Sequence, residues 1–366
     1  MAQSNRLVEM VQARIDRFLD QRTSIFPSIS ADLAPLTDFS RQFLSGGKRF
    51  RAQFCYWGWR SATAQDSTAE GVEFDATIGV ASALELFHAA ALVHDDIIDS
   101  SDTRRGAPSA HSRFAALHEN SGFTGSAAQF GTSAAILLGD MLQSWSDELL
   151  DESLSRLPDS DRVTATRAQF NRMRTEVAAG QYLDILEENA WNTRSEADLL
   201  SNAQQVIVYK SAKYSIEAPL LIGASLGGAS DGQLDTLGEF GLPLGIAYQL
   251  RDDLLGVFGD STVTGKPSGD DLREGKRTVL VALALQQLPS SAKNAVNELL
   301  GDPALRQDQI EMLQRTIRAS GAVEQVERLI SRNVDRANAA LDEASLDADA
   351  IGELRTLTRS VTERIA

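Results

Sequence analysis

The chain has 366 residues, of which 43% are hydrophobic and 23% charged, so it can bury a large core in one large domain or two smaller ones. Its 35 basic and 51 acidic residues give a formal net charge of −16, which argues against unaided binding to nucleic acid or anionic lipid surfaces. Cys55 is the single cysteine, which excludes an intrachain disulfide and C-x-x-C metal sites and fits a reducing cytoplasm.

Apolar residues recur at three- and four-residue spacing along almost the whole chain, whereas alternating, strand-like runs are scarce. This pattern predicts an all-α protein. Residues 1–14 lack the apolar centre of a signal peptide. The longest apolar stretch, residues 77–93, contains Glu85 and His88 and leads into three aspartates, so we expect a buried core helix and no stable membrane insertion.

The periodic segments predict helices at residues 74–99, 133–150, 163–188, 197–226, 234–257, 278–288 and 323–341. Stretches rich in Gly, Pro, Ser or Asp predict breaks at residues 61–71, 119–131, 156–160, 227–232 and 259–270. None of these breaks is long enough to be a linker. We therefore predict a single domain over residues 1–366, with the helices after about residue 278 as part of it.

The segment His94-Asp95-Asp96-Ile97-Ile98-Asp99 places three carboxylates at the end of the long apolar helix. Asp95 and Asp99 are four residues apart and Asp96 lies three before Asp99, so the three side chains are expected to converge on one small volume. Mg²⁺ relieves such repulsion by taking carboxylate oxygens, water and substrate phosphate oxygens. Taken alone, the motif is more typical of a solvated acidic helix end, but basic residues follow it directly.

A second acidic motif has Gln249 one helical turn before Asp252 and Asp253, again after an apolar run. Two buried acidic segments are costly unless cations share the site. The loop that follows, residues 264–278, carries Lys266 and Lys276 and is expected to close over phosphates.

Two basic segments accompany the acidic ones. Arg104 and Arg105 are adjacent guanidiniums that can grip phosphate through paired hydrogen bonds. Gly47, Lys48 and Arg51 combine close backbone approach with two cations three residues apart on a starting helix. Taken alone, this second segment would be an ordinary turn with surface cations.

Two pairs of polar residues lie inside apolar helical patterns between the acidic motifs. Gln181 and Asp184 are three residues apart in one of them, and Lys210 with Ser211 lies in the other. Each of these groups, considered alone, is more typical of a satisfied polar group in a core.

These residues, in this order, resemble the trans-isoprenyl diphosphate synthase family, also called polyprenyl synthetases, and geranylgeranyl diphosphate synthases within it. The resemblance is strongest over residues 46–277 and is carried by Gly-Gly-Lys-Arg-x-Arg, Phe-His, the first aspartate motif with its twin arginines, Gly-Gln-x-x-Asp, Lys-Ser, Gln-x-x-Asp-Asp and Gly-Lys with a later Lys. It implies an isoprenoid synthase-type helical bundle around a central cavity, a homodimer, and Mg²⁺-dependent head-to-tail coupling of an allylic diphosphate with isopentenyl diphosphate.

The resemblance also implies roles for individual residues. Direct ligands of three Mg²⁺ ions would be Asp95, Asp99 and Asp252, supported by Asp96, Asp184, Asp253 and Asp271. The allylic diphosphate would be held by Arg104, Lys210, Lys266 and Lys276, with Gln181 nearby. Isopentenyl diphosphate would be held by Gly47, Lys48, Arg51, His88 and Arg105.

The predicted chemistry separates a carbocation from diphosphate, so charge on the leaving oxygens must be stabilised. Ser211 and Gln249 are candidates for groups beside the carbocation, and the departing diphosphate is expected to take the final proton, so no side chain is assigned as general base. Gly256 departs from the family pattern because many relatives carry a third aspartate there. Metal binding at the second motif would then depend on Asp252 and Asp253.

The growing lipid is expected to run back along the helix from Asp95, past Ala91, Ala90 and Phe87. Phe87 lies about 12 Å from Asp95 at 1.5 Å of rise per residue. The small alanines leave room and Phe87 forms a floor, which predicts geranylgeranyl diphosphate or a somewhat longer product. The alternative is that Phe87 is ordinary core and another helix closes the tunnel.

Two other functions remain open from the sequence. A class I terpene cyclase also ionises a prenyl diphosphate at an aspartate-rich helix, but it does not need an isopentenyl site such as the one suggested by Lys48 and Arg51. A non-catalytic regulatory subunit of a heteromeric synthase is favoured only by Gly256. The preferred allylic starter and the downstream pathway cannot be read from the sequence.

Overall fold

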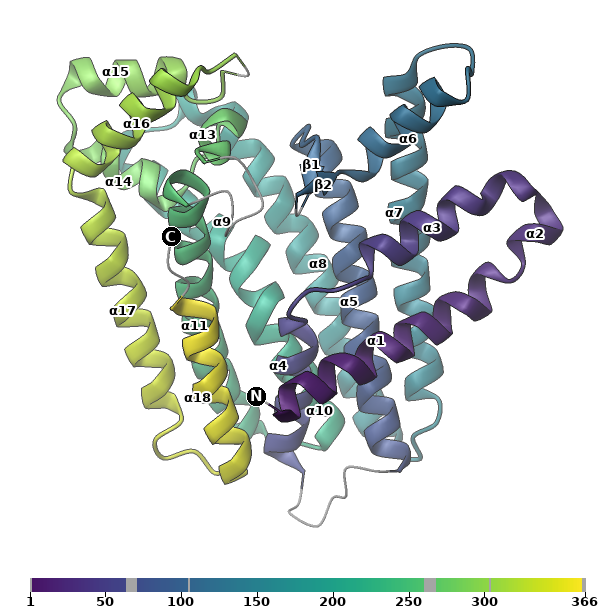
Figure 1. Cartoon of the computed structure of the whole chain (residues 1–366). Helices are drawn as coiled ribbons and strands as arrows, with labels where there is room; N and C mark the ends of the chain where they lie inside the picture. The colour runs from purple at the N-terminus through teal and green to yellow at the C-terminus, as the bar shows by residue number, and fades with distance from the viewer. Residues whose placement is uncertain (1, 64–70, 105, 260–267, 303, 364–366) are drawn as a thin grey trace. The chain divides into compact units, whose positions relative to one another are not determined.

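The computed structural model describes the chain except at residues 1, 64–70, 105, 260–267, 303 and 364–366, and of residues 2–4 it describes only the backbone. Helices dominate the described chain (Figure 1), so the all-α prediction is confirmed. The α-helices are α1 (Ala2–Thr23), α2 (Phe26–Ile29), α3 (Ala34–Phe43), α4 (Phe50–Ala62), α5 (Val72–Ile98), α6 (Ala110–Asn120), α7 (Ala127–Leu154), α8 (Ser160–Ala190), α9 (Glu196–Val206), α10 (Ala218–Gly227), α11 (Asp231–Phe258), α13 (Asp270–Glu274), α14 (Val279–Gln287), α15 (Ser290–Leu299), α16 (Gln307–Ala319), α17 (Ala322–Ala340) and α18 (Ala348–Thr362).

Short elements of other kinds complete the described chain. Two 3₁₀ turns are η1 (Ala31–Leu33) and η2 (Trp191–Thr193), and η3 (Ile207–Glu217) is a π-helix. A two-residue hairpin pairs β1 (Thr103–Arg104) with β2 (Ala107–Pro108) in antiparallel fashion.

The chain divides into two compact units. Unit 1 comprises residues 1–166 and 222–228, and unit 2 comprises residues 167–221 and 229–366. The prediction of a single domain over residues 1–366 stays a prediction.

Helix α5 is the core of unit 1, where it packs against α7, α4 and α1. It is long and apolar enough to cross a membrane, but 83% of its most apolar window is buried inside the protein, as predicted for a core helix. Glycine permits its closest approach to α7, because a Cβ at Gly79 would lie 2.0 Å from Ser153 Oγ. Any side chain at this position would push the two helices apart.

Helix α11 organises unit 2, where it packs against α17, η3, α13 and α18. Close backbone contact again requires glycine, because a Cβ at Gly245 would lie 2.5 Å from the Ala212 carbonyl oxygen. On the side of α8, a Cβ at Gly180 would lie 2.3 Å from the Lys210 backbone nitrogen. The π-helix is therefore packed between two glycine-bearing helices.

Two predicted elements differ from the structure. The helix predicted at 197–226 is continuous, but its middle is the π-helix η3. The spacing of apolar residues does not reveal a π-helix, because those residues lie on only one face of the helix. The break predicted at 119–131 is too long, since α7 begins at Ala127 with the Ser126 side chain accepting a hydrogen bond from the Gln129 backbone N–H. Gly131 is a packing glycine, because a Cβ there would lie 2.4 Å from the His111 carbonyl oxygen.

Candidate active site

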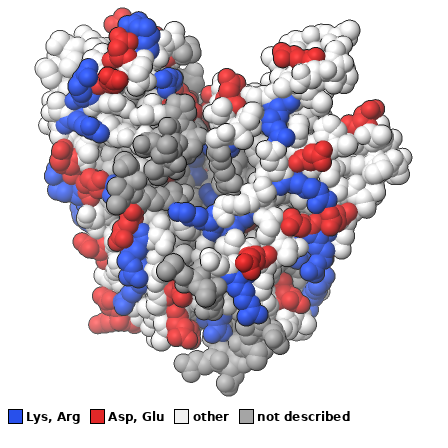
Figure 2. Space-filling model, viewed as in Figure 1, with Lys and Arg blue, Asp and Glu red and all other residues white. Residues whose placement is uncertain are grey.

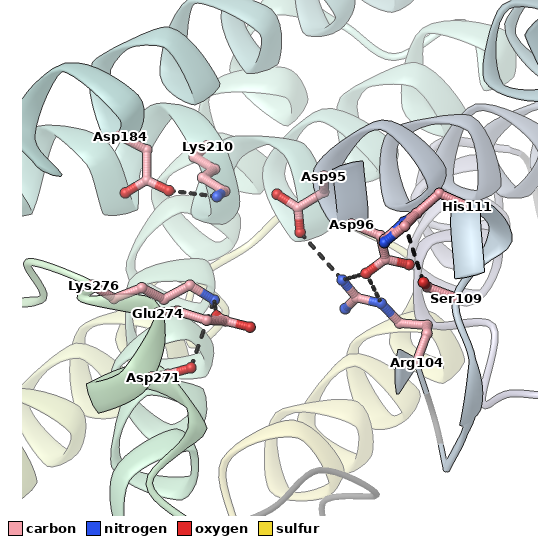
Figure 3. Close-up of polar contacts among 10 residues, drawn as sticks. All are labelled: Asp95, Asp96, Arg104, Ser109, His111, Asp184, Lys210, Asp271, Glu274 and Lys276. Carbon is pink, nitrogen blue, oxygen red and sulfur yellow. Dashed lines mark hydrogen bonds and ion pairs between the residues drawn. The ribbon is translucent and has the colours of Figure 1, made fainter. Parts of the chain in front are cut away.

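The first acidic cluster, defined as Asp95, Asp96 and Asp99, lies at the C-terminal end of α5 in unit 1. Asp96 is completely buried and accepts hydrogen bonds from Arg104 Nε at 2.8 Å and from Arg104 Nη2. The same Nη2 lies 3.4 Å from Asp95 Oδ2 (Figure 3). The β1–β2 hairpin supplies this guanidinium, and the Ser109 N–H donates to the Asp102 carbonyl at 2.9 Å across its base.

The three carboxylates do not converge as the spacing predicted. Asp96 is fully buried and hydrogen-bonded to Arg104, whereas Asp95 and Asp99 are only half-buried. Successive residues on a helix are rotated by about 100°, so Asp96 lies to one side of the face shared by Asp95 and Asp99. Its hydrogen bonds to Arg104 keep its carboxylate there. Over the described part of the chain, no three Asp, Glu, His or Cys side chains are close enough to enclose a metal ion by themselves.

The backbone around the first acidic cluster is constrained. The Asp99 N–H donates to the Asp95 carbonyl at 2.8 Å and ends α5. Ser100 follows with φ of 54°, one of two left-handed residues other than glycine among those the structure describes. Such conformations are uncommon and concentrate at functional sites.

The other such residue is Arg49, with φ of 52°, inside the predicted isopentenyl segment of unit 1. Gly46 and Gly47 also have positive φ, at 67° and 86°, so the chain winds tightly before α4 begins. Lys48 is exposed and Arg51 is half-buried in the first turn of α4. His88, on α5, is half-buried as well, and Arg105 lies outside the described residues.

The second acidic cluster, defined as Asp252, Asp253 and Asp271, belongs to unit 2. Asp253 is 5% exposed, and its Oδ1 accepts a hydrogen bond of 2.7 Å from Gln249 Nε2. Burial raises the pKa of Asp253 to about 8, with the negative charges of Asp271 and Asp252 acting in the same direction and the Gln249 hydrogen bond opposing them. Within the described residues, its Oδ2 has no hydrogen-bond partner.

The space beside Gly256 explains why a third aspartate is missing from this motif. A Cβ at Gly256 would lie 1.9 Å from Asp271 Oδ2 and 2.4 Å from Asp271 Cγ. The carboxylate of Asp271, from α13, thus fills the volume that a side chain at position 256 would need. Gly256 does not leave the second motif short of a carboxylate, because Asp271 brings one to the same place.

Two of the cations predicted to hold the allylic diphosphate, Lys276 and Lys210, lie against carboxylates in unit 2. Lys276 Nζ is 2.6 Å from Glu274 Oε2 and 3.6 Å from Asp271 Oδ1. Lys210 Nζ is 2.5 Å from Asp184 Oδ2 (Figure 3). Lys266 lies outside the described residues.

The π-helix and α8 carry the remaining predicted polar groups of unit 2. Lys210 and Ser211 are half-buried on η3, and the close approach at Gly180 brings α8, with Gln181 and Asp184, against this stretch. The Gln181 Nε2 is buried and has no hydrogen-bond partner among the described residues. A buried amide donor of this kind is available to a ligand.

The three residues predicted to set product length lie on α5 in unit 1. Ala90 is 1% exposed and Phe87 is 7% exposed, whereas Ala91 is half-buried. Phe87 and Ala91 are one turn apart and share a face with Asp95. Their part in chain length stays a prediction.

An ion pair that was not predicted from the sequence holds the predicted isopentenyl segment. Arg49 and Glu85 are both buried and form an ion pair of 3.2 Å. A signal was present in Glu85, a charged residue inside the most apolar stretch of the chain, since such residues are almost never fully buried unless they are paired.

Comparison with known proteins identifies the class to which this fold and these residues belong. The profile of the polyprenyl synthetase family matches residues 34–317, so the chain belongs to that family. It is similar to geranylfarnesyl diphosphate synthase from Aeropyrum pernix, with 30% identity over 88% of this chain and 91% of the relative. Geranylgeranyl diphosphate synthase from Saccharolobus solfataricus is also 30% identical, over 86% of this chain and 82% of the relative.

A solved structure gives a stronger similarity. Geranylgeranyl pyrophosphate synthase from Corynebacterium glutamicum, complexed with isoprenyl diphosphate and magnesium, is 39% identical, with a TM-score of 0.91 over 98% of this chain and 99% of that one. The chain therefore has the all-α isoprenoid synthase fold. It is a trans-isoprenyl diphosphate synthase, a prenyltransferase of the kind that includes the geranylgeranyl diphosphate synthases.

Proposed function

We propose that this prenyltransferase couples an allylic diphosphate to isopentenyl diphosphate in a Mg²⁺-dependent, head-to-tail reaction that yields geranylgeranyl diphosphate or a somewhat longer product. The observation that carries the metal dependence is Asp253, a buried carboxyl whose Oδ2 has no partner in the described chain and whose pKa is raised to about 8. A carboxyl that burial and neighbouring acids hold in its protonated form is poised to ionise when a cation arrives.

The donor set fits Mg²⁺ in particular. Both acidic clusters offer only carboxylate oxygens, which are the ligands that Mg²⁺ prefers, and the absence of a closed three-residue cage in the described chain suits an ion that keeps waters and substrate oxygens. We propose Asp95, Asp99 and Asp252 as direct ligands of three Mg²⁺ ions, supported by Asp96, Asp184, Asp253 and Asp271. When bound, Mg²⁺ supplies positive charge to the diphosphate oxygens as the allylic C–O bond breaks.

The cations of the chain bind and orient the two substrates. Arg104, Lys210 and Lys276, with Lys266 outside the described residues, hold the allylic diphosphate. In the structure each of the three described cations lies against a carboxylate, so each is fixed in place before substrate arrives. A preorganised cation costs no reorganisation when negative charge develops on the leaving group.

Isopentenyl diphosphate is held by Lys48, Arg51, His88 and Arg105, with the Gly47 backbone close by. Ser211 and Gln249 face the allylic carbon and stabilise its cation through the hydroxyl and the amide oxygen. The departing diphosphate accepts the proton that leaves the condensed intermediate. No side chain of the chain is needed as a general base.

Product length is set along α5. The small side chains of Ala90 and Ala91 leave room for a lengthening prenyl tail, and Phe87, two turns before Asp95, forms the floor. The buried position of Phe87 supports this proposal, because a tail that reaches it must displace a packed aromatic ring.

The proposed assembly is a homodimer. Ile136 and Leu137 on α7 are 42% and 65% exposed, and Phe130 on the same helix is 37% exposed. Exposed apolar residues grouped on one helix favour association with another apolar surface, and a second copy offers one of the same shape. Charged side chains of both signs are interspersed on the face of the molecule shown in Figure 2, which disfavours nonspecific binding of a polyanion there. We propose a cytoplasmic location, without stable membrane insertion.

Incubation of the purified chain alone with Mg²⁺, isopentenyl diphosphate and a series of allylic diphosphates tests this function. Elongated polyprenyl diphosphates are the expected products, and their loss in EDTA would establish the metal dependence. A cyclised hydrocarbon would instead indicate a terpene cyclase. Absence of turnover by the chain alone, with turnover restored by a partner chain, would indicate a regulatory subunit.

A further inference from the structure

Arg49 anchors the segment that carries Lys48 and Arg51, and its side chain is buried within unit 1. Arg49 Nη1 donates to Glu85 Oε2 at 3.2 Å, and its Nη2 donates to Gln12 Oε1 at 2.6 Å and to the Leu44 carbonyl. One guanidinium thus joins α1, the end of α3 and α5. The Arg49 and Glu85 side chains are each 4% exposed, so water does not compete for these bonds.

Glu85 has a second task at the start of α4. Arg49 is the N-cap residue of this helix and its side chain makes no cap hydrogen bond. The first N–H groups of a helix have no acceptor within the helix itself. Glu85 Oε1 accepts a hydrogen bond of 3.2 Å from the Ala52 N–H. The carboxylate of α5 therefore caps α4 from outside and places negative charge at its positive end.

The same contacts fix the backbone that carries Lys48 and Arg51. Arg49 has φ of 52°, a left-handed conformation that an arginine adopts only when its surroundings hold it there. On the other side of Lys48, Gln53 Nε2 donates to the Lys48 carbonyl at 2.6 Å. These bonds hold the backbone on both sides of Lys48 and Arg51.

Helix α5 relates this anchor to His88. Glu85 precedes His88 by three residues, which places them one turn apart on neighbouring positions of the same helix. One rigid element therefore holds both the anchor of the Lys48–Arg51 segment and the His88 side chain. A loss of the anchor would free the segment while leaving His88 in place.

We propose that Arg49 and Glu85 are a positioning pair that sets the affinity for isopentenyl diphosphate without touching it. This inference rests on the proposed function, in which Lys48, Arg51 and His88 bind that substrate. Displacement of a binding group by about 1 Å can cost up to about 100-fold in rate. The pair is expected to act on one substrate only, because its hydrogen bonds join α1, α4 and α5 to the end of α3 in unit 1 and involve no described cation proposed for the allylic diphosphate.

The test uses the full-length protein with Arg49→Lys and Glu85→Gln. Lysine keeps the charge but lacks the planar guanidinium whose two nitrogens reach the three acceptors, and glutamine keeps an acceptor for Ala52 while losing the ion pair. We expect KM for isopentenyl diphosphate to rise about tenfold in both variants. KM for the allylic diphosphate should change less than about twofold, since its ligands are untouched. Gln12→Leu, which removes one of the partners of Arg49, should give a smaller rise.

Glu73→Gln is the matched control. Glu73 also lies on α5 in unit 1 and pairs with an arginine, Arg162, at 2.9 Å, but its side chain is 45% exposed and its partner lies on α8 rather than in the isopentenyl segment. This variant should leave both KM values unchanged. Calorimetric binding of isopentenyl diphosphate to each variant, without allylic substrate, gives the affinity independently of turnover.

Three outcomes would overturn the inference. Arg49→Lys and Glu85→Gln that melt at lower temperature but keep the wild-type affinity for isopentenyl diphosphate would show a purely structural pair. An equal rise of KM for both substrates would show general loosening. A matching effect of Glu73→Gln would remove the specificity. Failure of the proposed function is distinct, because the unmodified chain would then show no elongation at all.

Discussion

The two acidic clusters neutralise their buried carboxylates in different ways. Asp96 in unit 1 is fully buried and carries a guanidinium of the same chain, which donates two hydrogen bonds to it. Asp253 in unit 2 is nearly as buried, but its hydrogen bond comes from the neutral amide of Gln249, and its pKa is raised to about 8. The first carboxylate has its counter-charge built into the fold, whereas the second has a pKa that favours the protonated form.

Because of this difference, the first cluster is expected to stabilise the fold by itself, whereas the second is expected to need a bound cation. An arginine that pairs with a buried aspartate contributes to folding, and its loss leaves an uncompensated charge. A buried aspartate beside other acids works against folding at neutral pH until a cation binds. We therefore expect substitutions in the first cluster to lower both stability and activity, and substitutions at Asp253 to lower activity while raising stability.

The largest effect should come from the proposed direct ligands. Asp95→Ala and Asp252→Ala should each lower kcat/KM by about 10³-fold, because each removes charge stabilisation at the leaving diphosphate. Steady-state kinetics at several Mg²⁺ concentrations would measure the loss. A variant of either residue that retained wild-type kcat/KM at low Mg²⁺ would contradict the proposed ligand set.

Arg104→Gln tests the built-in counter-charge of the first cluster. Removal of the guanidinium leaves Asp96 buried without its partner, so the free energy of unfolding should fall by about 3 kcal/mol. Urea unfolding monitored by circular dichroism measures this quantity. KM for the allylic diphosphate should rise as well. An Arg104→Gln protein as stable as the wild type would show that the ion pair with Asp96 does not support the fold.

Gly256→Asp tests the crowding beside Asp271. Restoring the aspartate that many relatives carry should lower kcat/KM by about tenfold or more, because the new side chain displaces the Asp271 carboxylate. The double variant Gly256→Asp with Asp271→Gly should recover part of the loss, since it returns one carboxylate to the same volume. A single variant that is more active than the wild type would mean that both carboxylates can be accommodated.

Asp253→Asn should have the smallest effect, on stability in metal-free buffer. The folded-state pKa of about 8 lies above the ordinary value of 3.8, so the cost of ionising Asp253 is absent below about pH 4, grows as the pH rises from about 4 to 8, and levels off above pH 8. The melting temperature of the wild type should therefore fall between pH 6 and pH 8.5, and the variant should melt about 5 °C higher at pH 8.5. Added Mg²⁺ should narrow the gap by stabilising the wild type. Parallel melting curves with identical pH dependence would contradict the assigned shift.

The predictable and unpredictable parts of the fold differ in physical origin. Helices α5, α8 and α11 were predicted to within a few residues because their apolar faces repeat at helical spacing. The π-helix was not, since its extra residue per turn follows from packing against Gly180 and Gly245. Helix α1 was not predicted either, although its buried residues Leu7, Val11, Ile15 and Phe18 recur at helical spacing.

The same distinction applies to the candidate active site. The aspartates and exposed cations could be identified by sequence because their residue types and order match a family. Their partners could not, since the pairing of Arg49 with Glu85 or of Gly256 with Asp271 joins positions that are far apart in the chain. Such pairs depend on which side chains fit into one volume, and that is settled only when the helices are packed.

The directions of the side chains on the π-helix depend on how many residues the helix has, and not only on which residues they are. Its 11 residues, Ile207–Glu217, contain both Lys210 and Ser211, and an ordinary α-helix would cover the same rise with fewer residues. Deletion of a single residue there would leave all the other residues unchanged, yet it would turn one end of the helix by about 100° relative to the other. Lys210 would then lose Asp184, although neither residue had been changed.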